Sequence, residues 1–475
     1  MNHPGNKYQI DMTHGPLFVK IVRFSIPLMF SYILQMLFHT IDLIVLGRFA
    51  SAQAMAAVGA TSGVTVLVMN IFFGLSVGIN VLTARYIGAK NKRNISKTVH
   101  TGAAAGLYGG IVMAAIGILV SRPILELMGT PENILGKSTL YLRFYCGSVP
   151  FLIFYNFGNS ILRAQGDTRR PLIFITIGGM TKILLNMLFV IGFRMDAGGV
   201  GLATLLANGV SAGLIIHALV TARDATRLFP SKIRFHGAIF IDMLKIGLPA
   251  GIQGSFFSIS NITIQASVNS FGDLAIAGNT AAQSLESLVY VGSSSFYYTA
   301  LSFLGQNHGA KKYKRIVRSF FYCVLCSWVF CILTGYTLWL TGENVLGLYN
   351  PDPDVIRWGM IRIRILFTTY FLCGTMDAIS GSLRGLGHSL KPTIVTLMGV
   401  CVFRIFWVFF IFPHHRSMEN LMISYPVSWF MVSAVNGCIL FYVCRKMFRN
   451  ALTGNEHHPH LGTLAAPSNE KKPLS

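Results

Sequence analysis

The hydrophobic residues of this chain lie in long blocks that polar and charged segments separate. Uncharged stretches cover residues 24–41, 49–84, 246–272 and 420–444. A helix needs about 20 apolar residues to cross a bilayer, so the pattern predicts an all-α polytopic membrane protein with about twelve transmembrane helices. The approximate first residues of these helices are Lys20, Ala54, Thr98, Ser138, Pro171, Gly199, Ile246, Leu274, Ser319, Ile361, Pro392 and Asn420.

The blocks also contain an internal repeat. The segment Gly88–Lys90 returns as Gly309–Lys311, and Leu162–Arg163 returns as Leu383–Arg384, each pair 221 positions apart. A constant offset predicts two copies of one six-helix unit, fused head to tail. Internal repeats in an apolar chain are typical of secondary transporters, in which the substrate site lies between the repeats.

The repeat divides the chain into four segments. We expect an N-terminal six-helix lobe at residues 15–222, a cytoplasmic linker at 223–245, a C-terminal six-helix lobe at 246–449 and a disordered cytoplasmic tail at 450–475. The two lobes are called the N-lobe and the C-lobe below.

Composition and charge agree with a membrane protein. Of the 475 residues, 53% are hydrophobic and 12% are charged, against about 25% charged in soluble domains. The net charge of +22 does not indicate nucleic acid, because most Lys and Arg residues lie in alternate loops and at the two ends. This asymmetry predicts that both termini of a multi-pass membrane protein are cytoplasmic. Anionic membrane lipids are sufficient partners for the charge.

The sequence does not favour an enzyme or a cofactor-binding protein. It contains no His-Glu-x-x-His motif, which would indicate an intramembrane metalloenzyme. Cys323-x-x-Cys326 lies in an apolar segment without a second ligand pair, and packing is the expected role of these cysteines. We therefore expect no catalytic residue, no metal site and no cofactor.

Ionisable side chains within the predicted helices are the main functional candidates, because each costs roughly 2.5–3.5 kcal/mol on insertion. They are Asp42, Lys182, Glu286 and Asp377, with Arg404 as a weaker candidate. Lys182 has about eleven residues on either side, or ~16 Å of helix, which is too far for its side chain to reach water. Asp42 is the only acid in a span of the same repeat, so we expect it to lie beside Lys182.

Several motifs resemble the multidrug and toxic compound extrusion (MATE) family. The resemblance extends over nearly the whole chain. The matching segments are Ile26–Pro27 followed by Asp42, Gly78–Ala89, Leu162–Thr168, Gly305–Ala310 and Leu383–Gly387. The resemblance implies two six-helix lobes that form a V around a central cavity. It also implies efflux of small, amphipathic and often cationic organic compounds in exchange for H⁺ or Na⁺.

The resemblance further implies an ion-coupling cluster in the N-lobe. In the family, the cluster joins an acid of the first helix, Asn-x-x-x-Asp of the fifth and Thr of the sixth. Asp42 and Thr204 match, whereas the fifth-helix pair reads Lys182-x-x-x-Asn186. Na⁺ needs several oxygen ligands and is repelled by a nearby cation. We therefore expect the Lys182 ammonium to occupy the place of the ion until a proton neutralises Asp42, which favours H⁺ over Na⁺.

The substrate cavity is expected in the C-lobe. Glu286 and Asp377 would attract a cationic drug, and the aromatic residues Tyr290, Phe296 and Tyr297 would add cation–π contact. The protein is expected to act as a monomer.

Two alternatives stay open. Lys182 would instead hold an anionic group of the substrate if the cargo were acidic or zwitterionic. A lipid-linked glycan flippase of the same architecture would need several cations in its cavity, for which Lys182, Arg364 and Arg404 are the candidates.

Overall fold

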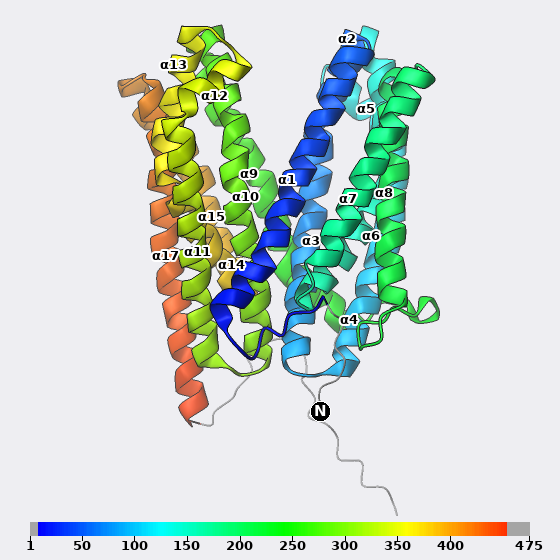
Figure 1. The fold of residues 1–475 in the computed structure, drawn as a ribbon, viewed down its shortest axis with the longest axis vertical. Coiled ribbons are helices and arrows are strands. Elements are labelled where there is room, and N and C mark those ends of the chain that lie inside the picture. Colours follow the sequence, from blue (N-terminus) through cyan, green and yellow to red (C-terminus); the bar gives the residue numbers. More distant parts are fainter. Residues whose placement is uncertain (1–7, 454–475) are drawn as a thin grey trace, which may run out of the picture.

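The computed structural model describes residues 8–453, and this part of the chain is helical without a strand. The helices form two bundles that meet at one end and lean apart toward the other (Figure 1). Of the predicted tail, residues 450–453 continue the last helix, and the remainder lies outside the described residues. The predicted all-α fold is confirmed.

Ten elements make up the first half of the chain. They are α1 (Leu17–Phe49), α2 (Ala52–Ala60), α3 (Ser62–Gly88), α4 (Lys92–Ala104), η1 (Ala105–Gly109), α5 (Gly110–Leu127), α6 (Glu132–Ala164), α7 (Arg169–Asn186), η2 (Met187–Gly192) and α8 (Asp196–Val220).

The second half follows a short 3₁₀ turn, η3 (Pro230–Lys232). Its elements are α9 (Gly237–Asn269), α10 (Asp273–Gly309), α11 (Tyr313–Leu340), α12 (Gly342–Tyr349), α13 (Pro353–Arg362), η4 (Ile363–Phe367), α14 (Thr368–Gly385), α15 (Leu390–Thr396), η5 (Leu397–Val402), α16 (Phe403–Phe406), η6 (Trp407–Ile411), η7 (Phe412–His414) and α17 (Met418–Thr453).

Consecutive elements join into long helical columns, which reproduce the predicted arrangement of two lobes of six. For example, α4, η1 and α5 form one column, and α13, η4 and α14 form another. Within residues 8–453, eight columns are long and apolar enough to cross a membrane by length and composition. The others (α6, α9, α10 and the α13–α14 column) are also long, but they carry more polar residues along their length.

The second lobe begins earlier than its first uncharged run. Helix α9 starts at Gly237, inside the segment 223–245 that was expected to be a linker. The first turns of α9 are amphipathic, and Ile239 and Met243 are buried in the N-lobe core. Polar residues such as Lys245 interrupt the apolar run, which is why the helix begins before the uncharged run does.

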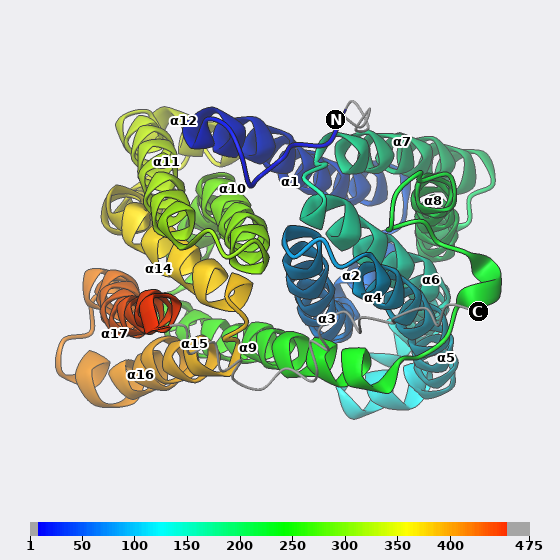
Figure 2. The same ribbon diagram turned by 90° about the horizontal axis from the view of Figure 1, so that it is seen from below.

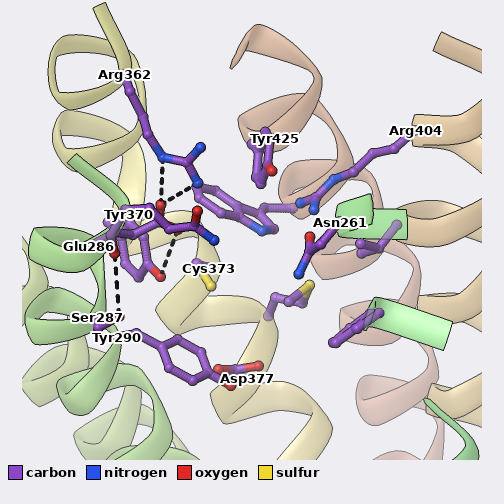
Figure 3. A pocket seen from close by; sticks show the side chains of 15 residues that line it. Asn261, Glu286, Ser287, Tyr290, Arg362, Tyr370, Cys373, Asp377, Arg404 and Tyr425 are labelled. Atoms are coloured by element: carbon purple, nitrogen blue, oxygen red, sulfur yellow. Dashed lines mark hydrogen bonds and ion pairs between the residues drawn. The ribbon is translucent and has the colours of Figure 1, made fainter. Parts of the chain in front are cut away.

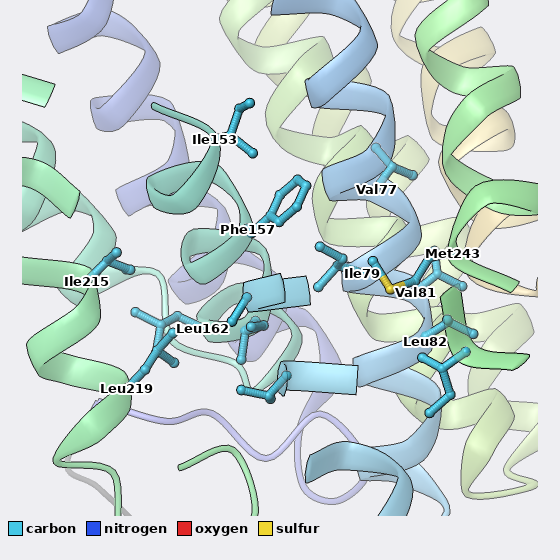
Figure 4. Close-up of a cluster of buried hydrophobic side chains, with 14 of the residues drawn as sticks. Val77, Ile79, Val81, Leu82, Ile153, Phe157, Leu162, Ile215, Leu219 and Met243 are labelled. Atoms are coloured by element: carbon cyan, nitrogen blue, oxygen red, sulfur yellow. The ribbon is translucent and has the colours of Figure 1, made fainter. Parts of the chain in front are cut away.

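The N-lobe core lies where α3 packs against α6 and the start of α9 (Figure 4). Gly74 allows this approach, because a Cβ there would lie 2.3 Å from the Gly251 amide nitrogen of α9. Residues Gly74–Gly78 also spell the Gly-x-Ser-x-Gly pattern of hydrolase nucleophiles. Ser76, however, lies inside α3 and donates to the Phe72 carbonyl at 2.9 Å, so the segment is a packing surface and not a nucleophile elbow.

The repeated motifs have the same backbone conformation and contact each other. Lys90 and Lys311 have φ values of 55° and 56°. A Cβ added at Gly88 would lie 1.9 Å from the Gln306 carbonyl oxygen, and one added at Gly309 would lie 1.9 Å from the Arg85 carbonyl oxygen. The ends of α3 and α10 therefore touch through their backbones, and this contact closes the lobes at the end that carries the basic loops.

Residues 8–16, called the N-terminal strap below, cross this same end (Figures 1 and 2). The Ile10 amide donates to the Gly166 carbonyl of the N-lobe at 3.2 Å. The Met12 carbonyl accepts hydrogen bonds from Asn307 at 3.2 Å and from Arg315 at 3.1 Å, both in the C-lobe. The strap therefore joins the two lobes where they are closest.

Candidate functional site

The structure brings three of the four predicted ion-coupling residues together in the N-lobe. Asp42 of α1 is buried, and its Oδ2 forms an ion pair with the Lys182 ammonium of α7. Its Oδ1 accepts a hydrogen bond from Asn186 Nδ2 at 2.6 Å. Lys182 and Asn186 are four residues apart, so they lie on one face of α7 and reach the same carboxylate.

Both oxygens of Asp42 are therefore occupied by donors. The Asn186 amide is oriented by this contact, because the opposite orientation would place its oxygen against a carboxylate oxygen. Asn186 Oδ1 consequently has no hydrogen-bond partner among the described residues. The arrangement is a charge-neutral pair of a buried carboxylate and a partly exposed ammonium, and a proton on Asp42 would break it.

Thr204, the fourth predicted residue, does not take part in this hydrogen bonding. Its hydroxyl donates to the Val200 carbonyl of its own helix at 2.8 Å, and no bond joins it to Asp42 within the described chain. Tyr141 of α6, which sequence analysis missed, is close enough to interact electrostatically with Asp42. No short-range sequence pattern marks Tyr141, because it reaches the cluster only through the packing of α6.

The C-lobe contains a cavity of about 330 Å³, which is lined by Glu286, Tyr290 and Asp377 among other residues (Figure 3). Glu286 faces a cation that was not predicted. Its Oε2 accepts hydrogen bonds from Arg362 Nε at 2.9 Å and Nη2 at 2.6 Å, and its Oε1 accepts one from the Tyr370 hydroxyl at 3.3 Å. The fork of Arg362 therefore neutralises Glu286. The signal for this pair was Glu286 itself, since a lone acid in an uncharged span requires a partner.

Asp377 and Arg404 line the same cavity without an ion pair to each other. Asp377 Oδ2 accepts a hydrogen bond from the Ser293 hydroxyl at 2.7 Å. Arg404 donates through Nε to the Ser428 hydroxyl at 3.1 Å, and its guanidinium lies 3.9 Å from the ring centre of Tyr425.

Phe296 and Tyr297, although predicted for the cavity, do not line it. Phe296 is buried in a cluster with Phe24 of α1. Tyr297 accepts a hydrogen bond from Arg384 Nη1 at 2.6 Å. Tyr297 is seven residues beyond Tyr290, or ~10 Å along α10, which places it past the cavity toward the closed end.

Arg384 belongs to a repeated pair of arginines that sequence analysis used only as landmarks. Arg384 Nη2 donates to Gln253 of α9 at 2.7 Å. Its counterpart Arg163 donates to Tyr32 of α1 at 3.4 Å and stacks on Tyr298 at 4.9 Å. Gln253 and Tyr32 are 221 positions apart, as are the two arginines. In each lobe, an arginine at the end of the fourth helical column therefore contacts the first helix.

Two copies of one sequence unit are recognised by a family model. The MatE model matches residues 27–188 and again residues 249–410. The chain belongs to the MatE family. This match covers more than half of the chain and repeats at the spacing of the two lobes.

Individual MatE relatives agree with this assignment. The chain is 25% identical over 394 residues to the probable multidrug resistance protein YpnP of Bacillus subtilis (strain 168), covering 83% of this chain and 88% of that protein. It is 23% identical over 349 residues to an FAD transporter of Shewanella oneidensis, covering 73% of this chain and 77% of that one.

A solved MatE-type structure has the same fold. It is described as the outward-facing conformation of a multidrug resistance MATE family transporter, and it superposes with a TM-score of 0.87 at 20% identity, covering 94% of this chain and all of that one. MatE proteins are integral membrane transporters and not enzymes. The predicted family resemblance and the predicted absence of enzymatic function are thus confirmed.

Proposed function

We propose that this MatE protein exports small organic compounds by alternating access, in exchange for protons. The observation that carries the proposal is the occupation of both Asp42 oxygens by Lys182 and Asn186. Multidrug resistance in the name of the Bacillus relative supports organic compounds as cargo.

A proton fits this cluster better than Na⁺. Na⁺ would need several oxygen ligands, whereas Lys182 presents an ammonium and Asn186 presents its amide nitrogen to Asp42. A proton on Asp42 removes the ion pair and leaves the Lys182 cation without a counter-charge. That change favours a rearrangement of α1 against α7, and a difference in stability between two conformations is what coupling requires.

The arrangement of the lobes supports alternating access. They touch at the end with the basic loops and lean apart at the other (Figure 1). If the basic loops are cytoplasmic, as the positive-inside rule predicts, this conformation faces outward. An exporter releases cargo in this conformation, and the Asp42–Lys182 ion pair is intact in it. A proton that enters from outside would then break the pair and favour the return to the conformation that collects cargo. The site in the bacterial cell membrane, the cytoplasmic termini and the monomeric state belong to the same proposal.

The flippase alternative receives less support. It needs several unpaired cations for pyrophosphate, but Lys182 is paired with Asp42. Among the described cavity residues, Arg362 is paired with Glu286, and Arg404 is left as a single cation without an acid. Two acids and two arginines line the cavity, so its formal charges balance, which favours a small organic cargo over a pyrophosphate.

The proposal is tested with the purified protein in liposomes and the cationic dye ethidium. We expect a proton gradient to drive dye movement and a sodium gradient not to do so. Asp42→Asn is expected to abolish movement, and Lys182→Asn to change its pH dependence. Asp196→Asn is a matched control, because Asp196 forms a Lys–Asp pair with Lys137 at 2.6 Å near the surface of the same lobe.

Three outcomes contradict parts of the proposal. Movement driven by sodium alone overturns proton coupling but leaves export standing. An unchanged pH profile in Lys182→Asn removes the role of the lysine. No movement of any dye under either gradient would direct the search toward anionic cargo and the flippase.

A further inference from the structure

The C-lobe cavity contains two charged side chains that the fold does not pair. Glu286 and Arg362 satisfy each other. Asp377 and Arg404 remain, both on the cavity wall and each with a single hydrogen bond to a serine. We propose that this cavity binds a small aromatic zwitterion, with its acid group on Arg404 and its ammonium on Asp377. The inference rests on the proposed export function only for the direction of transport.

Arg404 presents an unused guanidinium edge. The residue is 4% exposed, and of its donors only Nε has a partner within residues 8–453. Tyr425 covers one face of the guanidinium at 3.9 Å, and Trp429 lies 6.0 Å away. Stacking holds the plane while leaving Nη1 and Nη2 free at the edge. Two parallel N–H donors in a plane match a carboxylate or a phosphate.

Asp377 supplies the opposite charge. Ser293 donates to Oδ2 at 2.7 Å, whereas Oδ1 has no hydrogen-bond partner among the described residues. Arg384 acts electrostatically on Asp377, but the guanidinium of Arg384 forms its hydrogen bonds with Tyr297 and Gln253. An unpaired charge inside a protein costs free energy. A ligand that brings an acid group to Arg404 and an ammonium to Asp377 therefore gains the most binding free energy.

The size and lining of the cavity limit the ligand further. A volume of about 330 Å³ suits a compound of one or two rings, and aromatic side chains form much of the wall, including Tyr290, Tyr370 and Trp429. Arg404 and Asp377 come from different helices and line this one cavity (Figure 3). A purely cationic drug would be attracted by Asp377 but repelled by the positive charge of Arg404.

The test is a binding measurement by calorimetry on the protein in nanodiscs, without an ion gradient. The probes are 4-(aminomethyl)benzoic acid, a zwitterion, and its methyl ester, a monocation of nearly equal size. A charge-assisted bidentate contact to Arg404 is expected to make the acid bind about tenfold or more tightly than the ester. Arg404→Gln is expected to remove this preference, and Arg404→Lys to retain only part of it.

Arg364→Gln is the matched control, because Arg364 lies on the adjacent column but is exposed; the preference for the acid should persist in it. Asp377→Asn should weaken binding of both amines but not of 4-methylbenzoate, which lacks the ammonium group. This second variant keeps the test decisive if Arg404→Gln fails to fold.

Equal affinity of the wild type for acid and ester overturns the inference, and so does a preference that persists in Arg404→Gln. The proposed function can fail separately. If the acid binds but no dye moves in liposomes, export fails and the binding site stands. If dye moves and the acid does not bind, the zwitterion site alone is wrong.

Discussion

At the scale of the residue, the acids within the two lobes have different hydrogen-bond and ion-pair partners. Asp42 has a lysine and an amide, and Glu286 has the fork of an arginine and a tyrosine hydroxyl. A buried pair contributes little net stability, but removal of one partner leaves a charge without compensation. The Glu286–Arg362 pair is therefore expected to be structural, and the pair at Asp42 is expected to be switchable because Lys182 is partly exposed.

The first prediction follows from this difference. Arg362→Met is expected to destabilise the protein by about 3–5 kcal/mol, because it leaves the Glu286 carboxylate without a counter-charge. The double variant Glu286→Gln with Arg362→Met should lose much less, since both charges are gone. Thermal unfolding in detergent checks this, with Arg364→Met as the exposed control. A double variant whose loss equals the sum of its two single losses would contradict the pairing.

At the scale of the element, the N-terminal strap depends on local hydrogen bonds. Asp11 accepts them from the Thr13 amide and hydroxyl, each at 2.8 Å. Burial raises the pKa of the Asp11 carboxyl, but the hydrogen bonds from Thr13 and His14 outweigh it, and the pKa falls to about 2 from 3.8. A depressed pKa means that the carboxylate stabilises the folded strap above the unfolded pKa.

A second prediction concerns this carboxylate. Its stabilisation is expected to be complete at neutral pH and to be lost as the pH falls between about 4 and 2. At neutral pH, Asp11→Asn should mimic acid and make the amides of residues 8–16 exchange faster with deuterium. Asp352→Asn, at the other end of the molecule, should leave that exchange unchanged. Unaltered exchange in Asp11→Asn would show that the contacts to α10 and α11 hold the strap alone.

At the scale of the whole molecule, the two lobes meet through the repeated glycines. Gly88 and Gly309 each lie against a carbonyl of the opposite motif, so the closed end depends on two residues without a side chain. The strap crosses the same end. Alternating access requires this contact to open, and anything that separates α3 from α10 should favour the opposite conformation.

The third prediction tests the glycine contact. In Gly309→Ala the new Cβ would lie 1.9 Å from the Arg85 carbonyl, so the ends of α3 and α10 must move apart. Spin labels on cysteines placed at Lys92 and Lys314 should report a longer distance than in the wild type, in a background with Cys438 replaced by Ser. A Cβ added at Gly213 has no atom within 4 Å, so Gly213→Ala should leave the distance between the spin labels unchanged. An unchanged distance in Gly309→Ala would mean that the backbone contact does not hold the lobes together.

The sequence by itself determined the membrane spans, the duplication and the pairing of Asp42 with Lys182. Block lengths and a constant offset are one-dimensional properties, and a lysine far from either end of an apolar helix has to find an anion within its own lobe. The same logic pointed to Glu286 and Asp377 as acids inside the predicted helices, but it did not identify their neighbours.

Tertiary structure alone decided which charges are satisfied. Arg362 reaches Glu286, and Arg404 stacks on Tyr425 with a free edge. Phe296 turns toward α1 instead of the cavity. These outcomes depend on the rotation of each helix about its axis and on contacts between segments that are far apart in the chain. Such contacts leave no periodic trace in the sequence, because one residue per helix is enough to make them.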